Sequence, residues 1–309
     1  MAHDVVILGI FVADTTYRAA RMPVMGETLI GEHFHLTPGG KGSNQAVAAA
    51  KAGAATHLIT KLGQDDFAQM AQAIWHDAGV VAEVVTDATS YTGAAFVFID
   101  SHTGNNAIIV SPGVAGTISP ADIDAPAPLI SSANIFLTQL EQPQEAAFHA
   151  LKIAKQAGVT TLLNPAPAAP LADGMMALCD YVTPNETEAT SLTGIEVTDI
   201  QSAASAAEKL LEMGAKNALI TLGEQGVLLH NAEKTVHIPA ISAGKVAETT
   251  GAGDAFNGGF ATALSEGADP EEAAWFGTAT AAIAVTRAGT AASMPDRSEI
   301  SALLSLARG

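Results

Sequence analysis

The amino-acid sequence predicts an α/β fold: a doubly wound, mostly parallel sheet with helices on both faces and a small β-sheet lid. Short apolar runs such as residues 5–8 have the character of buried parallel strands, and they alternate with helical stretches. By contrast, residues 28–37 and 92–110 read as β-rich segments set apart from this alternation, which predicts a separate small sheet. We therefore expect a single domain over residues 1–309, with the lid inserted from about residues 15–38 and 92–110.

Composition limits the classes of function. Hydrophobic residues make up 48% and charged residues 15% of the 309 residues, so the chain can bury a large core. The formal net charge of −18 argues against binding to nucleic acid or to an anionic membrane, both of which need a basic surface. A single cysteine, Cys179, excludes an intrachain disulfide and fits a reducing cytoplasm. No apolar run reaches the length of a membrane span, and the N-terminus lacks a basic stretch, so we expect neither a membrane helix nor a signal peptide.

The first strand, residues 5–9, is followed by Asp14, the first charge beyond its carboxyl end. Ligands bind at this end of open α/β sheets, so Asp14 is a candidate acceptor for a substrate hydroxyl; an Asx turn is the alternative. His33 and His35 share one face of the next predicted strand, residues 28–37. Because no third ligand is nearby, solvated histidines are favoured over a metal pair.

A glycine-rich stretch, residues 38–45, precedes an Ala-rich helix predicted over residues 46–52. Its glycines let the backbone approach a ligand closely, but the spacing is not that of a Walker loop. Asn44 either presents its amide to a hydroxyl-rich ligand or caps the helix. A strand (56–62), a helix (67–77) and a hairpin (94–99 with 107–110) follow, and the hairpin belongs to a sheet able to close over a site.

From residue 135 the alternation resumes, with strands predicted at 135–137, 160–163, 181–183 and 218–222 and a helix that opens at Pro143 and closes at Gly158. Asn185 and Glu188 are three residues apart at a helix start and therefore share a face. They can serve one Mg²⁺ shell or form a capping box, and the local pattern fits both.

Near the C-terminus, Thr250-Gly251-Ala252-Gly253-Asp254 leads into another helix. A glycine loop at a helix start exposes backbone N–H groups at the positive end of the helix dipole, which is a ready anion site. Asp254 is then either a general base or a helix cap.

Three motifs occur in this order along the chain: Gly39-Gly40-Lys41-Gly42-Ser43-Asn44, Asn185-Glu186-Thr187-Glu188 and Thr250-Gly251-Ala252-Gly253-Asp254. Together with residues 164–167 and 220–223, they resemble ribokinase-type members of the PfkB sugar kinase family over essentially the whole chain. The resemblance implies an ATP-dependent kinase of the primary hydroxyl of a pentose, with D-ribose as the first expectation. The alternatives are kinases of 2-deoxyribose, another sugar or a nucleoside, and a non-catalytic sugar or nucleotide sensor.

The resemblance also implies residue roles and cofactors, namely ATP, Mg²⁺ and a monovalent cation, K⁺. The catalytic positions are Asp254 as base with Gly251, Ala252 and Gly253 as the anion hole. The sugar positions are Asp14, Gly40, Lys41, Asn44 and Glu141. The nucleotide positions are Asn185, Thr221, Gly223, Gly226 and Thr278, and Glu188 is linked to Mg²⁺. The K⁺ positions are Glu248, Thr250, Ala284, Arg287, Gly289 and Ser293.

Three residues depart from the family pattern: Val12 stands where Asn is usual, Glu248 where Asp is usual, and Thr278 where His is frequent. The Val12 side chain cannot form the hydrogen bond to the sugar that Asn would form, which makes 2-deoxyribose a rival of ribose as the substrate. The lid strands have apolar residues and exposed edges, and such edges are usually covered, so we expect a homodimer in which two lids cover each other.

Overall fold

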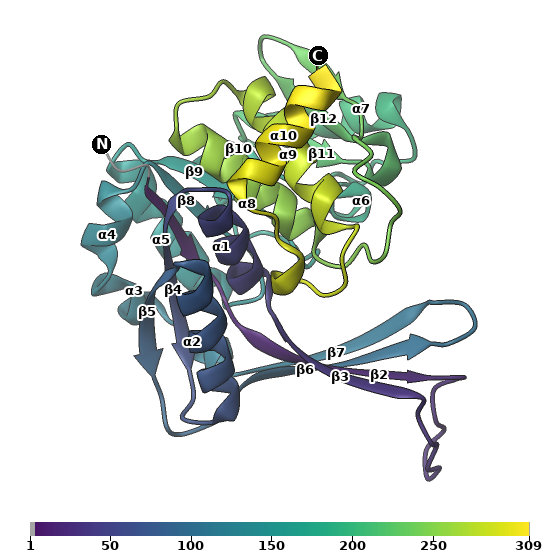
Figure 1. Ribbon diagram of the computed structural model, residues 1–309. Helices are drawn as coiled ribbons and strands as arrows, with labels where there is room; N and C mark the ends of the chain where they lie inside the picture. The colour runs from purple at the N-terminus through teal and green to yellow at the C-terminus, as the bar shows by residue number, and fades with distance from the viewer. Residues whose placement is uncertain (1–3, 309) are drawn as a thin grey trace.

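A computed structural model of the chain, which describes residues 4–308, contains a nine-stranded sheet and a separate four-stranded sheet (Figure 1). The strands of the large sheet are β1 (Asp4–Leu8), β4 (Ala55–Leu62), β5 (Val81–Thr86), β8 (Ile135–Thr138), β9 (Thr160–Leu163), β10 (Tyr181–Val182), β11 (Asn217–Thr221), β12 (Val227–Asn231) and β13 (Thr235–Ile238). Their order is β13-β12-β11-β10-β9-β8-β1-β4-β5. The seven strands from β11 to β5 run parallel, and β12 and β13 join antiparallel at one edge. The predicted mostly parallel sheet is confirmed.

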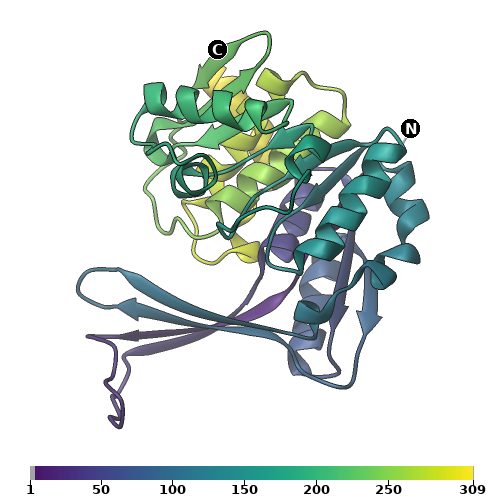
Figure 2. The same ribbon diagram turned by 180° about the vertical axis from the view of Figure 1, so that it is seen from behind.

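Helices cover both faces of this sheet. On the face toward the viewer in Figure 1 lie α1 (Lys41–Lys51), α2 (Asp66–Ala78), α8 (Ala252–Ser265), α9 (Pro270–Ala284) and α10 (Arg297–Arg308). On the opposite face, seen in Figure 2, lie α3 (Pro120–Asp124), α4 (Ala127–Ser132), α5 (Gln144–Gln156), α6 (Glu186–Thr193) and α7 (Ile200–Glu212). Successive side chains of β1 serve the two layers in turn: Val5 and Ile7 pack under the first group of helices, and Val6 and Leu8 under the second. The central strand is therefore buried on both faces, as its continuous apolar run predicts.

The four-stranded sheet is the predicted lid. Its strands are β2 (Val12–Ala19), β3 (His33–Gly39), β6 (Thr92–Asp100) and β7 (Asn106–Gly113), in the order β3-β2-β6-β7. Both views show it extending away from the main body (Figures 1 and 2). The lid begins at Val12, so Asp14 lies within β2 rather than in a turn after β1.

Several predicted boundaries were wrong. The helix expected over 46–52 begins at Lys41, because Gly40 is its N-cap residue, with φ 88°. The strand expected over 28–37 covers only 33–39. Strands β5, β12 and β13 were not predicted; their alternating or short patterns do not resemble the continuous apolar runs of the central strands. Within residues 4–308, no helix combines the length and the apolar character needed to cross a membrane.

Candidate active site

The predicted site residues gather at the carboxyl edge of the parallel strands, where ligands bind in open α/β sheets. A cavity of about 130 Å³ opens there beside the first turns of α1 and α8. It is lined by Lys41, Asn164, Ala166, Thr183, Asn185, Glu188, Thr221, Gly251, Gly253, Asp254 and Asn257. Segments that are distant in the sequence, around residues 41, 185 and 254, therefore share one cavity.

Asp254 lies in the first turn of α8 and is only 6% exposed. The N-cap residue of this helix is Gly251, and the Asp254 carboxylate faces α1 instead. Its Oδ2 accepts from Asn44 Nδ2 (3.0 Å) and its Oδ1 from Gln45 Nε2 (3.0 Å). The capping alternative for Asp254 is therefore wrong, and so is the capping alternative for Asn44. A buried carboxylate held by two neutral amides beside a cavity has the arrangement that a general base requires.

The start of α8 has the backbone conformation that an anion site requires. Gly251 adopts φ 83°, a left-handed value that favours glycine, and a Cβ there would come within 3.3 Å of Thr290. The first-turn amides of a helix have no carbonyl partner inside the helix. Of these residues, the Ala252 amide already donates to the Thr249 carbonyl (3.1 Å). Gly253 faces open space, since a Cβ there would meet no heavy atom of residues 4–308 within 4 Å other than its chain neighbours and the nearby backbone of α8.

The charged side chains of Asp14, Lys41 and Glu141 lie at the end of the site next to the lid, together with the amide of Asn44. Asp14, on β2, packs so closely on Gly39 that a Cβ there would lie 2.1 Å from Asp14 Oδ2. Glu141 Oε2 accepts from the Lys41 backbone amide (2.8 Å) and so ties the segment after β8 to the start of α1. Asn44 Oδ1 is buried and has no partner within the described chain. An unpaired buried acceptor is costly, so this end is built to receive hydroxyl donors.

The electrostatics of this end are unbalanced. Burial raises the pKa of Asp14 to about 6, and the charges of Asp254 and Glu248 add to the effect. Burial likewise raises the pKa of Glu141 to about 7, although Lys41 opposes the shift. Burial lowers the pKa of Lys41, but Asp254, Glu141 and Glu188 outweigh this effect and the pKa is raised. Lys41 is therefore the cation shared by the carboxylates of the site.

Asn185 and Glu188 form a capping box. Asn185 Oδ1 accepts from the Glu188 amide (2.8 Å), and Glu188 Oε2 accepts from the Asn185 amide (2.9 Å). The capping interpretation is confirmed, and both side chains nevertheless line the cavity. Thr221 ends β11 in the same cavity. The short 3₁₀ helix η3 (Gly223–Gln225) follows, with Gly223 as its first residue and Gly226 directly after it.

Thr278 does not line this cavity, because it lies on α9, is buried, and donates its hydroxyl to the Ala274 carbonyl (2.8 Å).

The proposed K⁺ positions come together beside the anion site. Glu248 Oε2 accepts from the Gly289 amide (2.9 Å), and the Glu248 amide donates to the Val285 carbonyl (3.2 Å). Thr250 is exposed next to Gly251, Ala284 ends α9, and Ser293 donates to the Thr290 carbonyl (2.7 Å). The Arg287 guanidinium instead pairs with Glu299.

Thr290, which also lies against Gly251, donates to the Pro38 carbonyl (2.9 Å), so the segment around residue 290, the start of α8 and the glycine stretch are in contact. Among residues 4–308, no group of three His, Cys, Asp or Glu side chains is arranged to hold a metal ion, and His33 and His35 are exposed on β3.

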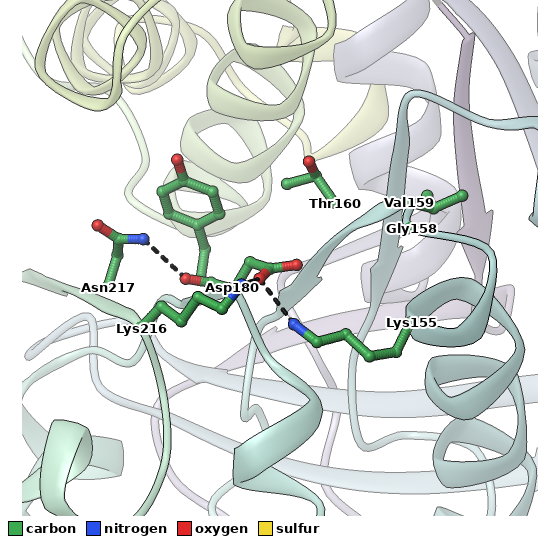
Figure 3. Close-up of a pocket in the computed structure, with 8 residues that line it drawn as sticks. Lys155, Gly158, Val159, Thr160, Asp180, Lys216 and Asn217 are labelled. Atoms are coloured by element: carbon green, nitrogen blue, oxygen red, sulfur yellow. Dashed lines mark hydrogen bonds and ion pairs between the residues drawn. The ribbon is translucent and has the colours of Figure 1, made fainter.

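A second hollow, of about 500 Å³, lies at the opposite edge of the sheet, where β9, β10 and β11 begin (Figure 3). Lys155 and Lys216 both approach Asp180 Oδ1 to 2.7 Å, and Asn217 donates to the Asp180 carbonyl (2.9 Å). The two ammonium groups are therefore committed to one carboxylate. This hollow is larger than the cavity at Asp254, but its polar groups tie strand ends together rather than converging on open space.

Comparison with known proteins agrees with this geometry. A family model described as pfkB family carbohydrate kinase matches residues 2–297. The ribokinase of Haemophilus influenzae is 38% identical, and the alignment covers 97% of each chain. The deoxyribokinase of Salmonella typhi is 36% identical over 98% of this chain and 99% of its own. The structure of Arabidopsis thaliana ribokinase complexed with ribose and ATP superposes with a TM-score of 0.93 at 33% identity, over 98% of this chain and 99% of that one.

Proposed function

This chain belongs to the pfkB family of carbohydrate kinases, and from that premise we propose that it transfers a phosphoryl group from ATP to the primary hydroxyl of D-ribose, giving ribose 5-phosphate. The observation that carries the proposal is the pairing of a buried carboxylate, Asp254, with the open amide turn at the start of α8. Ribokinases that align over nearly the whole chain, including one solved with ribose and ATP, support the choice of substrate.

In the proposed reaction, ATP with Mg²⁺ supplies the phosphoryl group. Asp254 takes the proton of the primary hydroxyl as its oxygen forms a bond to the γ-phosphorus and the bond from that phosphorus to ADP breaks; such a base contributes about 10²–10⁴-fold. The turn of Gly251, Ala252 and Gly253 stabilises the charge of the phosphoryl group through its Gly251 and Gly253 amides, because the Ala252 amide already donates to the Thr249 carbonyl. Losing one such donor typically costs about 10²–10³-fold. Lid closure excludes water, which would otherwise accept the phosphoryl group.

The remaining residues divide between sugar, nucleotide and ions. Asp14, Gly40, Asn44 and Glu141 hold the sugar, and Lys41 balances charge between sugar and phosphates. Asn185, Thr221, Gly223 and Gly226 border the nucleotide, with Thr278 near the adenine. Glu188 is the carboxylate that lines the cavity besides Asp254, so it suits a Mg²⁺ ion held mainly by water and phosphate. The backbone carbonyls around Glu248, Thr250, Ala284, Arg287, Gly289 and Ser293 suit a K⁺ ion.

The second candidate is a kinase of 2-deoxyribose. Val12 supports it: the side chain is 3% exposed and lies two residues before Asp14, on the same face of the lid. An apolar side chain there offers no partner to a sugar hydroxyl. The similarity to a deoxyribokinase over nearly the whole chain supports the same candidate.

A phosphorylation screen tests these candidates directly. Purified protein with MgATP is offered pentoses, 2-deoxyribose, hexoses and nucleosides, and the phosphorylated carbon is located by NMR. We expect the highest kcat/KM with ribose, phosphorylated at its primary hydroxyl. Turnover of none of these compounds, together with measurable sugar or ATP binding, would favour a non-catalytic sensor instead.

We also propose that the protein forms a homodimer through its lids. Strand register places Tyr17, Phe34, Leu36, Phe96 and Ile109 on the lid face opposite Asp14. Tyr17 contacts the rings of Phe34 and Phe96, yet it is 43% exposed, and Phe34 and Ile109 are more exposed still. A continuous apolar patch on an extended sheet with free edges is normally covered by a partner.

Light scattering at micromolar concentration should therefore report twice the mass of the chain, and Phe34→Glu, which places a charge in the patch, should shift it toward a monomer. A monomeric wild-type protein would contradict the proposal.

A further inference from the structure

A buried glutamine, Gln45, makes the contact with Asp254 that the motifs did not predict. We propose that Gln45 is the positioning residue of the catalytic base, and that Gln139 and Asn164 fix its amide in the one orientation that serves Asp254. The inference rests on the proposed role of Asp254 as base. Gln45 and Gln139 are fully buried.

The hydrogen-bond partners determine how each amide is turned. Asn164 Nδ2 donates to the Thr183 carbonyl (2.9 Å), so Asn164 Oδ1 is the atom that faces Gln45. Asn164 Oδ1 (3.1 Å) and Asp254 Oδ1 (3.0 Å) are both acceptors, and they lie at the same end of the Gln45 amide. Only Nε2 can satisfy both. Gln45 Oε1 then faces Gln139 Nε2, which donates to it.

These contacts belong to a ring of hydrogen bonds that passes through side chains and through the backbone of Thr183 and Gly253. Thr183 Oγ1 donates to Asn257 Oδ1 (2.6 Å), and Asn257 Nδ2 donates to the Gly253 carbonyl (2.8 Å), one residue before Asp254. The ring runs from Asp254 through Gln45, Asn164, Thr183 and Asn257 back to α8. It therefore fixes the Asp254 carboxylate and the amide turn beside it in one frame.

Four separate parts of the chain contribute to the ring, and only Asp254 and Asn257 share an element, α8. Gln45 lies on α1, Asn164 directly follows β9, Thr183 directly follows β10, and Asn257 is on α8; Gln139, which supports Gln45, directly follows β8. A frame anchored on strand ends is rigid, which suits a group whose displacement by about 1 Å can cost about 10²-fold in rate. A neutral amide also orients the carboxylate without the ion pair that Lys or Arg would form, so the oxygen remains available to a proton.

The proposal predicts a separation of kcat from KM. Gln45→Met keeps the length of the side chain but removes the amide, and we expect kcat to fall about 10- to 100-fold. The KM values for sugar and ATP should stay within about threefold. The reason is that the hydrogen-bond partners of Gln45 are Asn164, Asp254 and Gln139, none of which is proposed to bind the sugar or the nucleotide. Gln139→Met leaves the Gln45 amide in place but removes the donor that fixes it, and we expect a smaller fall in kcat, again without a change in KM.

Ser43→Ala is the matched control. Ser43 lies on the same turn of α1, is also fully buried, and accepts a hydrogen bond from Trp75 Nε1 (2.8 Å). This variant loses one buried hydrogen bond away from Asp254, so its melting temperature should fall while kcat stays at the wild-type value.

The outcomes separate this inference from the proposed function. If Asp254→Asn is inactive while folded Gln45→Met and Gln139→Met both retain wild-type kcat, the positioning role is wrong and the base assignment stands. If Gln45→Met does not fold, Gln139→Met alone tests the positioning role, and a wild-type kcat in folded Gln139→Met would show that this role is wrong. If Asp254→Asn retains its activity, the proposed base itself is wrong.

Discussion

The two ends of the candidate site treat negative charge in opposite ways. At the α8 end, the Asp254 carboxylate receives an uncharged amide donor on each oxygen, from Asn44 and Gln45. At the lid end, burial raises the pKa of Asp14 to about 6 and that of Glu141 to about 7, with Lys41 as the shared cation.

The difference follows from what each end must do. The amide donors at Asp254 already hold the carboxylate that is proposed to accept the proton, so its orientation is fixed before the substrate binds. Acceptors without donors at the lid end, among them Asn44 Oδ1, are completed only by a ligand with hydroxyl groups. The α8 end is thus preorganised for chemistry and the lid end for recognition, and variants at the two ends should differ in kind.

The largest effect is expected at the base. Asp254→Asn keeps the shape of the side chain but removes its capacity to accept the proton, so kcat should fall by about 10²–10⁴-fold. The amide turn remains, so ATP should still bind, as measured by calorimetry. A variant that retains more than about a tenth of wild-type turnover would contradict the role of Asp254 as base.

Two glycines of the amide turn should respond differently to the same added methyl group. Gly253→Ala places the methyl in open space, so the fold should be as stable as wild type. The methyl would stand where phosphate must approach the amide, so kcat/KM for ATP should fall by about 10²–10³-fold, as when one such donor is lost. Gly251→Ala must adopt φ near 83° beside Thr290, so it should also lower the melting temperature. Unchanged kinetics in Gly253→Ala would show that phosphate does not contact this turn.

Much of this arrangement could be predicted from the sequence. Asn44 and Asp254 lie in the first turn of a helix, and Asp14 follows β1 along the chain, within β2. The rule for parallel sheets then brings them to one edge. The central strands were predictable for the same reason, because their apolar runs are continuous.

The amide frame around Asp254 was not predictable. Gln139 and Asn164 lie 94 and 119 residues from Gln45, and a buried glutamine has no local sequence signature. Only the strand order, with β9, β8 and β1 adjacent, brings these three amides together.

A smaller effect is expected where the lid end selects its sugar. A hydroxyl buried against Val12 has no partner, which costs about 1–3 kcal/mol. Val12→Asn should therefore shift the ratio of kcat/KM for ribose to that for 2-deoxyribose toward ribose by about 5- to 100-fold. Val12→Ala is the control, because it removes bulk without adding an amide. An unchanged ratio in a folded, active Val12→Asn would show that this residue does not contact the sugar.

The smallest effect concerns the stability of the unliganded protein against pH. Glu141 has its pKa raised to about 7 in the folded chain, whereas in the unfolded chain the carboxyl ionises near 4.5. The folded state therefore holds a proton that the unfolded state has already lost. The stability that this carboxyl contributes is complete below about pH 4.5 and is lost as the pH rises through about 7. Asp14, with its pKa raised to about 6, adds to the loss in the same direction.

Glu141→Gln cannot ionise, so between pH 5 and 8 its free energy of unfolding should fall by about 1–2 kcal/mol less than that of wild type, allowing for partial screening by solvent. Urea unfolding at both pH values measures this difference, with Glu224→Gln, a substitution in η3, as the control. Saturating ribose should reduce the difference between wild type and Glu141→Gln, because its hydroxyl groups supply further hydrogen-bond donors to the ionised carboxylates. If wild type instead gains more stability between pH 5 and 8 than Glu141→Gln does, the charge of the ionised Glu141 is already stabilised in the unliganded fold. The contrast between the two ends of the site would then be wrong.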